Sequence, residues 1–254
     1  VKEWVEQPEQ VSLEHNPETG SVKIIRRGRH EVVADYKPRI LWGEQDGKPF
    51  TVLDARMHLK NSPISLPIQV YDAYSLLRGA HVHEYEAPAE AVRVAFSLNH
   101  VGWMHGEPVD IPTGRISPWN TPEGAGLMWE PNETGTELQS IHYLSQRFIP
   151  LVQVLLELWT GEKIGIQAVD VYLKEIGWCT LESGRDHSAK APRHPLLNER
   201  ELTMDTLAQW LQLVDQLGPL PFLAIADRVH LQSQAQVMTT ALEGLHERLY
   251  PGTY

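Results

Sequence analysis

The sequence has 254 residues, 42% of them hydrophobic, and a net charge of −11, values that suit a globular protein with a sizeable core. The negative charge argues against broad electrostatic binding to nucleic acid, although it leaves room for a local basic site. A single cysteine excludes an internal disulfide, and no apolar run approaches the length of a bilayer span. With no signal-peptide pattern at Val1, we expect a cytoplasmic protein without a membrane segment, incomplete at one or both ends.

The first 135 residues have the pattern of β structure. Two hairpins are predicted, one around the turn residues 16–20 and one around Asp46-Gly47, a pair that favours a tight turn. Residues 68–70 and 91–98 follow as strands, and the alternation of Val92, Val94, Phe96 and Leu98 predicts a buried face. Residues 104–136, rich in Gly and Pro, are either a long loop or a set of weak strands. Short strands between turns indicate an antiparallel sandwich or barrel.

Helical spacing begins further along the chain. Apolar residues from Ile141 to Trp159 predict a central helix that ends near Gly161, and 164–173 returns to strand character. Residues 182–199 are polar and contain prolines, which makes them the best linker candidate. Beyond them 204–217 predicts an amphipathic helix ended by Gly218-Pro219.

The last stretch, 229–254, predicts a long amphipathic helix. Its apolar positions recur at intervals of four and three residues: Leu231, Ala235, Met238, Leu242, Leu245 and Leu249. Glu243 and His246 are three residues apart and therefore neighbours on the flank of this stripe. One interpretation is a lid on the preceding domain; the other is the first long helix of a helical domain. The fold class is therefore α+β: a β-rich domain over 1–181, a linker over 182–199 and a helical region over 200–254.

The strongest metal-like cluster is His81-Val-His83, followed by Glu84 and Glu86. In a strand the two histidines share a face and would bind one ion. The segment resembles the cupin pattern, in which a glutamate follows four residues after the His-x-His pair, but Ala87 holds that position here. Surface histidines without metal are the plainer interpretation, and we expect no cofactor.

Other reactive residues carry weaker signals. Arg78 and His83 have an Arg-x-x-x-x-His spacing found on a helix in some ribonucleases, but Gly79 and the strand-like sequence that follows argue against a helix. Cys179 lies in an apolar stretch, as a buried, inert thiol does. The linker is locally basic and offers candidate contacts to RNA phosphates, although a solvated loop is the simpler interpretation; these residues are Arg185, His187, Lys190, Arg193 and His194.

Several stretches together resemble the ApeA family of bacterial anti-phage proteins. Ile40-Leu-Trp-Gly43 with Asp46-Gly47 and the strand to Leu53 is similar to the family's early hairpin, and Gly79-Ala-His81 to its Gly-x-His strand. Residues 92–103, which end in Trp103, are similar to the segment after that strand, and 148–161 to a helix that ends in Thr-Gly. The most specific stretch, 236–249, is similar to the family's Gln-Ala-Leu-Glu-x-x-His-Arg-Arg helix.

The resemblance implies a β-rich sensor region joined to a helical HEPN (higher eukaryotes and prokaryotes nucleotide-binding) domain. That domain is a metal-independent ribonuclease whose catalytic Arg-x-x-x-x-His lies on a later helix, beyond this sequence. Glu243 and His246 match family positions, Glu247 replaces the first arginine and Arg248 keeps the second. These three matching residues are accessory candidates beside a catalytic site or, alternatively, helix-packing residues.

The favoured hypothesis is the sensor or regulatory region of an ApeA-like abortive-infection ribonuclease. Its expected partners are RNA, a phage-derived trigger and a second copy of the protein. The alternative is a non-catalytic β-sandwich that binds a phage protein or a small ligand. A cupin-like metal enzyme that uses His81 and His83 is a third, weaker hypothesis.

Overall fold

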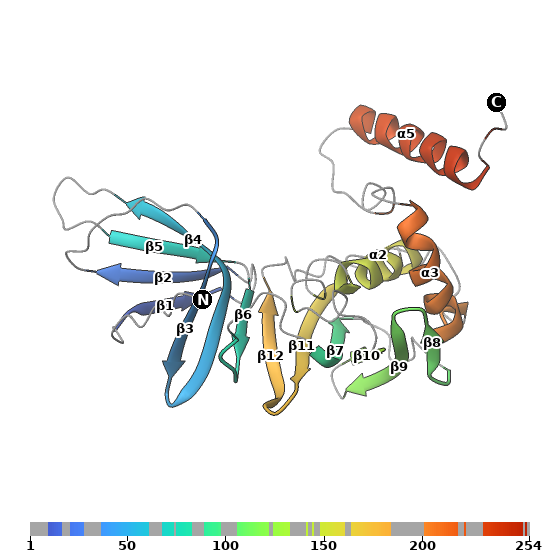
Figure 1. Cartoon of the computed structure of the whole chain (residues 1–254). Coiled ribbons are helices and arrows are strands. Elements are labelled where there is room, and N and C mark those ends of the chain that lie inside the picture. Colours follow the sequence, from blue (N-terminus) through green and yellow to red (C-terminus); the bar gives the residue numbers. More distant parts are fainter. Residues whose placement is uncertain are drawn as a thin grey trace. The chain divides into compact units, whose positions relative to one another are not determined.

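The computed structural model describes residues 10–16, 21–27, 37–60, 68–73, 75–82, 89–97, 106–121, 124–132, 141, 144, 148–160, 164–183, 201–217, 221, 231–250 and 252. It is α+β, as predicted, with mainly antiparallel strands and helices toward the C-terminal end (Figure 1). The chain forms two compact units, one of residues 1–85 and 179–186 and the other of 86–178 and 187–254. The predicted division into sensor domain, linker and helical region stays a prediction, and 184–199 of the linker lies outside the described residues.

The first unit is built from antiparallel strands in the order β1-β2-β5-β4-β6-β12, with β3 on the side of β4. These strands are β1 (Ser12–His15), β2 (Val22–Arg27), β3 (Arg39–Gln45), β4 (Lys48–Lys60), β5 (Ile68–Ala73), β6 (Ser75–Arg78) and β12 (Gly177–Ser183), which enters the unit at Cys179. The two predicted hairpins are confirmed as β1–β2 and β3–β4. Gly47 and Asp46 both have positive φ, which is the geometry that an Asp-Gly turn supplies.

Strand β4 holds this unit together because its two halves pair with different partners. Phe50–Leu53 pair with β6, whereas Arg56–Lys60 pair with β5. Between the halves, Asp54 has a φ of 58°, a left-handed conformation that bends the strand, and Figure 1 shows the curved β4 arrow. The core of this unit is formed by side chains of β2, β4, β5 and β6. Its buried residues are Val22, Ile24, Phe50, Val52, Ala55, Ala73 and Leu76.

The second unit contains a sheet in the order β11-β7-β10-β9-β8 and the helices. Its elements are β7 (Ala89–Ser97), β8 (Val109–Ile111), β9 (Gly114–Thr121), β10 (Gly124–Pro131), α2 (Ile149–Thr160), β11 (Gly165–Leu173), α3 (Met204–Leu217) and α5 (Leu231–Leu249). The region that the sequence left open, 104–136, therefore forms strands rather than a long loop over the residues described. The three predicted helices are confirmed as α2, α3 and α5, and much of the first predicted helix before Ile149 lies outside the described residues.

One face of this sheet is buried and carries the packing of the helices. Val92, Val94 and Phe96 are buried as predicted, while Leu98 lies outside the described residues. Trp129 is fully buried and its ring stacks on Phe148, with centroids 4.9 Å apart, just before α2 begins. The Trp210 indole of α3 donates to the Leu151 carbonyl of α2 across 3.0 Å, so the two helices are joined by a directed bond as well as by apolar contact.

Gly43 provides a first testable prediction. A methyl group at this position would come within 2.3 Å of the Phe50 ring, so Gly43→Ala should destabilise the protein by about 1–3 kcal/mol through overpacking. Urea unfolding measures this cost. In a Phe50→Leu background the smaller side chain should relieve most of it, and Glu44→Ala, at an exposed neighbouring position, should cost little. The same cost in both backgrounds would show that Phe50 is not the obstacle.

Candidate functional site

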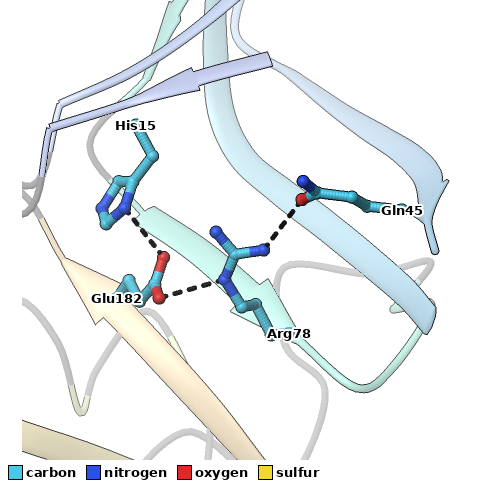
Figure 2. Close-up of polar contacts among 4 residues, drawn as sticks. All are labelled: His15, Gln45, Arg78 and Glu182. Carbon is cyan, nitrogen blue, oxygen red and sulfur yellow. Dashed lines mark hydrogen bonds and ion pairs between the residues drawn. The ribbon is translucent and has the colours of Figure 1, made fainter.

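A chain of polar contacts crosses the first unit and joins four residues that are far apart in the sequence. The Arg78 guanidinium donates from Nε to Glu182 Oε1 at 3.0 Å and from Nη1 to Gln45 Oε1 at 3.2 Å (Figure 2). The other Glu182 oxygen lies 3.2 Å from His15 Nδ1. One carboxylate therefore accepts a hydrogen bond from a guanidinium and lies within ion-pair distance of an imidazole, without a hydrogen bond to that imidazole.

Each member of this cluster is placed by the end of a strand. Arg78 lies on β6 opposite Thr180 of β12. Glu182 lies on β12 opposite Leu76 of β6. His15 is the last residue of the short strand β1, and Gln45 the last of β3. Because β1 and β12 are not neighbours in the sheet order, the His15–Glu182 contact ties a strand at one end of the unit to a strand at the other.

The cluster places an imidazole beside a carboxylate, but it does not orient that imidazole as an accessible base. His15 Nδ1 lies within ion-pair distance of Glu182 Oε2, yet that oxygen accepts no hydrogen bond within the described residues, so the contact does not fix the tautomer of the ring. Here the side chain of His15 is only 16% exposed, and its Nε2 is buried and makes no hydrogen bond within the described part of the chain. A base needs a substrate proton within reach of that nitrogen, so the geometry supports a structural tie.

Sequence reasoning missed this cluster. Glu182 fell within the predicted linker, His15 was not singled out, and Arg78 was considered for its spacing to His83. The structure places Arg78 at the end of β6 rather than on a helix, as expected, and gives it Glu182 as a partner. No sequence signal links residues that are 104 positions apart.

The predicted motif residues form a second arrangement, a packed corner made by β3, the start of β4 and residues 79–82. The His81 Nε2 lies 3.0 Å from the Gly43 carbonyl, and the Trp42 indole donates to the Val82 carbonyl at 2.7 Å. Beneath them the buried Thr51 hydroxyl donates to the Ala80 carbonyl at 2.8 Å and accepts from the Val82 amide at 2.9 Å. This corner comprises Trp42, Gly43, Thr51 and residues 79–82.

The corner bears on the metal hypothesis for His81. A carbonyl oxygen only accepts, so Nε2 must carry the proton in this contact and is occupied as a donor. His83, Glu84, Glu86 and Ala87 lie outside the described residues. Among the residues that are described, no group of three or more His, Cys, Asp or Glu side chains is arranged to hold a metal ion.

The C-terminal candidates Glu243, His246 and Arg248 lie on α5 and are exposed. Arg248 Nη1 donates to the Gln216 carbonyl near the end of α3 at 3.1 Å, and the His246 ring lies 5.3 Å from that of Tyr250. Arg248 thus joins α5 to α3, whereas the roles of Glu243 and His246 stay predictions. The RNA-contact candidates lie outside the described residues; they are Arg185, Lys190 and Arg193, with His187 and His194. Cys179 is buried, as predicted.

The second unit carries an aromatic–arginine stack that the sequence did not reveal. The Arg93 guanidinium carbon lies 3.7 Å from the ring centroid of Trp178 and 5.4 Å from that of Trp119, and Trp178 also meets Tyr172 edge to face. These side chains lie opposite the buried face of β7, since Arg93 alternates with Val92 and Val94. Trp178 is 39% exposed and the adjacent Ile176 is 52% exposed, so part of the stack faces solvent.

Comparison with known proteins found no match: no family model, no curated protein and no solved structure is similar to the chain. No helix among the described residues has the length and apolar character needed to cross a membrane. The functional interpretation therefore depends on the residues and geometry above.

The Arg78–Glu182 contact gives a second prediction. The side chains are 37% and 28% exposed, so solvent screens the pair, and a double-mutant cycle with Arg78→Ala and Glu182→Ala should give a coupling of at most about 1 kcal/mol. The Arg115–Asp110 pair is the matched control: at 3.9 Å, with side chains 55% and 90% exposed, its coupling should be near zero. Equal coupling energies in the two pairs would show that the Arg78–Glu182 contact stabilises the fold no more than an exposed surface pair does.

The third prediction concerns the tautomer of His81. Long-range ¹H–¹⁵N NMR spectra of the neutral ring should show the proton on Nε2, because that nitrogen donates to the Gly43 carbonyl. An Nδ1–H tautomer would mean that the contact is absent in solution, and it would return His81 Nε2 to the set of possible metal ligands.

Proposed function

We propose that the chain is the sensor or regulatory region of an ApeA-like anti-phage HEPN ribonuclease, and that this region acts by binding rather than by catalysis. RNA cleavage would belong to the HEPN domain of the whole protein, and a phage-derived molecule would be the trigger. In this proposal α3 and α5 are the first helices of the HEPN domain.

The packed corner is the observation that carries the proposal. The residues on which the N-terminal part of the resemblance depends occur in two separate stretches, yet they contact one another: His81 bonds to Gly43, and residue 79 donates its amide to the Pro49 carbonyl at 2.8 Å. The ring of Phe50 occupies the space left by the missing side chain of Gly43. Short motifs that match by chance have no reason to form one packed arrangement, whereas motifs that define a shared fold do.

A non-catalytic binding module is the second candidate, and the aromatic–arginine stack favours it. Solvent-exposed tryptophan on the open face of a sheet is a feature of binding surfaces, because indole supplies a large contact area at low entropic cost. Both candidates therefore assign recognition to this chain, and they differ in whether recognition triggers RNA cleavage.

The fourth prediction tests the proposal in cells that carry the gene to which this chain belongs. The cells are infected with phage, and the amount of intact RNA is measured over time. Wild-type cells should lose intact RNA after infection, and Trp178→Ala should delay or abolish that loss, because a tryptophan that anchors a binding interface contributes about 2 kcal/mol or more, which is over tenfold in affinity. Arg115→Ala is the matched control, since it changes an exposed residue of β9 outside the stack.

The outcomes separate the two candidates. RNA that stays intact in infected wild-type cells contradicts the ribonuclease proposal, and capture of a phage component under the same conditions would then favour the binding module. RNA loss that is equally fast in the Trp178→Ala cells would show that the stack is not the recognition surface. Protein levels in all strains control for loss of folding.

A further inference from the structure

We propose that the aromatic–arginine stack of the second unit binds a saccharide, with a sugar ring on the exposed Trp178 indole and its hydroxyls at Arg93 and Asp170. The other rings of the stack are Trp119 and Tyr172, and all five residues belong to one compact unit. This inference rests on the proposed function in one respect, that the stack is a recognition surface, and it adds the chemical class of the ligand.

The exposed indole of Trp178 supplies the apolar part of such a site. Its residue is 39% exposed, and the ring of Tyr172 meets it edge to face, with centroids 5.3 Å apart and planes at 68°. The Arg93 guanidinium lies against the same indole, 3.7 Å from the ring centroid. Because these contacts already restrict the indole, little side-chain entropy is lost when a ligand stacks on it. A pyranose ring has a face made mainly of C–H groups, which suits a flat aromatic surface.

The guanidinium of Arg93 supplies hydrogen-bond donors in fixed directions. Its carbon also lies 5.4 Å from the ring centroid of Trp119. That ring lies close to the sheet because its partner on β10 is Gly126, where a methyl group would come within 3.0 Å of the ring. A guanidinium that contacts two indoles keeps its planar set of N–H groups in one orientation. Its Nε is buried and makes no hydrogen bond within the described part of the chain, so the terminal nitrogens are the donors for a ligand.

The carboxylates around Arg93 favour a neutral ligand. Asp170 of β11 is opposite Arg93 in the register, and Met128 of β10 is opposite it on the other side. Glu130 lies two residues beyond Met128, hence on the same face, and is exposed. These carboxylates and the net charge of −11 would repel an anion, while Arg93 would repel a cation. A sugar uses both kinds of group, because each hydroxyl can donate to a carboxylate and accept from an N–H.

Binding of neutral sugars to the whole chain tests this inference. A glycan array should identify bound sugars, and titration calorimetry with the matching free oligosaccharide should give a Kd between roughly 10 µM and 10 mM, as expected of a small ligand on one indole. Trp178→Ala should raise that Kd at least tenfold, whereas Trp178→Phe, which keeps a ring, should raise it less. Trp42→Ala is the matched control, because it removes a tryptophan of similar exposure, 45%, from the other unit and should leave sugar binding unchanged.

The charge argument is tested with salt and with adenosine monophosphate as an anionic probe. Sugar binding should change by less than about twofold between roughly 50 and 500 mM NaCl, because screening acts on charged ligands. Arg93→Lys should weaken it severalfold, since an ammonium lacks the planar set of donors, and circular dichroism checks that this variant folds. Tighter binding of adenosine monophosphate than of any sugar, weakened steeply by salt, would overturn the inference and make Arg93 part of an anion site.

The remaining outcomes keep this inference separate from the proposed function. No sugar bound on the array, or equal sugar affinity in wild type and Trp178→Ala, would overturn the saccharide assignment. RNA loss in infected cells that still depended on Trp178 would then leave the proposed function standing. Sugar binding that Trp178→Ala abolishes, in a chain whose infected cells keep their RNA intact, would support the saccharide site and contradict the ribonuclease proposal.

Discussion

The buried hydroxyl of Thr51 is the interaction on which the order of the first unit depends. It accepts from one backbone amide and donates to one backbone carbonyl of residues 80–82, and these two bonds hold an irregular segment against β4. Without them the amide of Val82 and the carbonyl of Ala80 would be buried without partners, which costs more than an ordinary hydrogen bond contributes. That fixed segment in turn positions His81 beside Gly43 and lets Trp42 reach the Val82 carbonyl. The contacts of His81 and Trp42 in the packed corner therefore depend on the two hydrogen bonds of Thr51.

The elements whose apolar residues recur with a clear helical or strand period were predictable from the sequence. Helix α3 has the predicted bounds, 204–217, because its apolar residues recur with the helical period and Gly218-Pro219 signals its C-terminal end. The alternation of Val92, Val94 and Phe96 likewise identified the buried face of β7. Strand β12 was not predicted: its last residues fall in the polar stretch that begins at Glu182, and its place in the sheet comes from pairing with β6 rather than from its own composition.

The candidate sites were predictable only where their residues are close in sequence. His81 was identified from its motif, although its contact with Gly43 was not. The cluster of His15, Gln45, Arg78 and Glu182 and the stack of Arg93 with Trp119 and Trp178 combine residues from distant strands, and the register that brings them together is set by the cores of the two units. A single sequence contains the residues of such sites but not their adjacency.

The connectivity of the first unit has a consequence for synthesis in the cell. Its strands β6 and β12 pair with each other, yet the part of the chain from Glu86 to Ile176, which contains β7 to β11, lies between them. A ribosome must therefore complete that whole insertion before β6 receives its partner, and until then the edge of β6 is available to other strands. Closing so long a loop is also slow. Translation that stops within the insertion would leave a half-built sheet, which makes truncated products of this chain prone to aggregation.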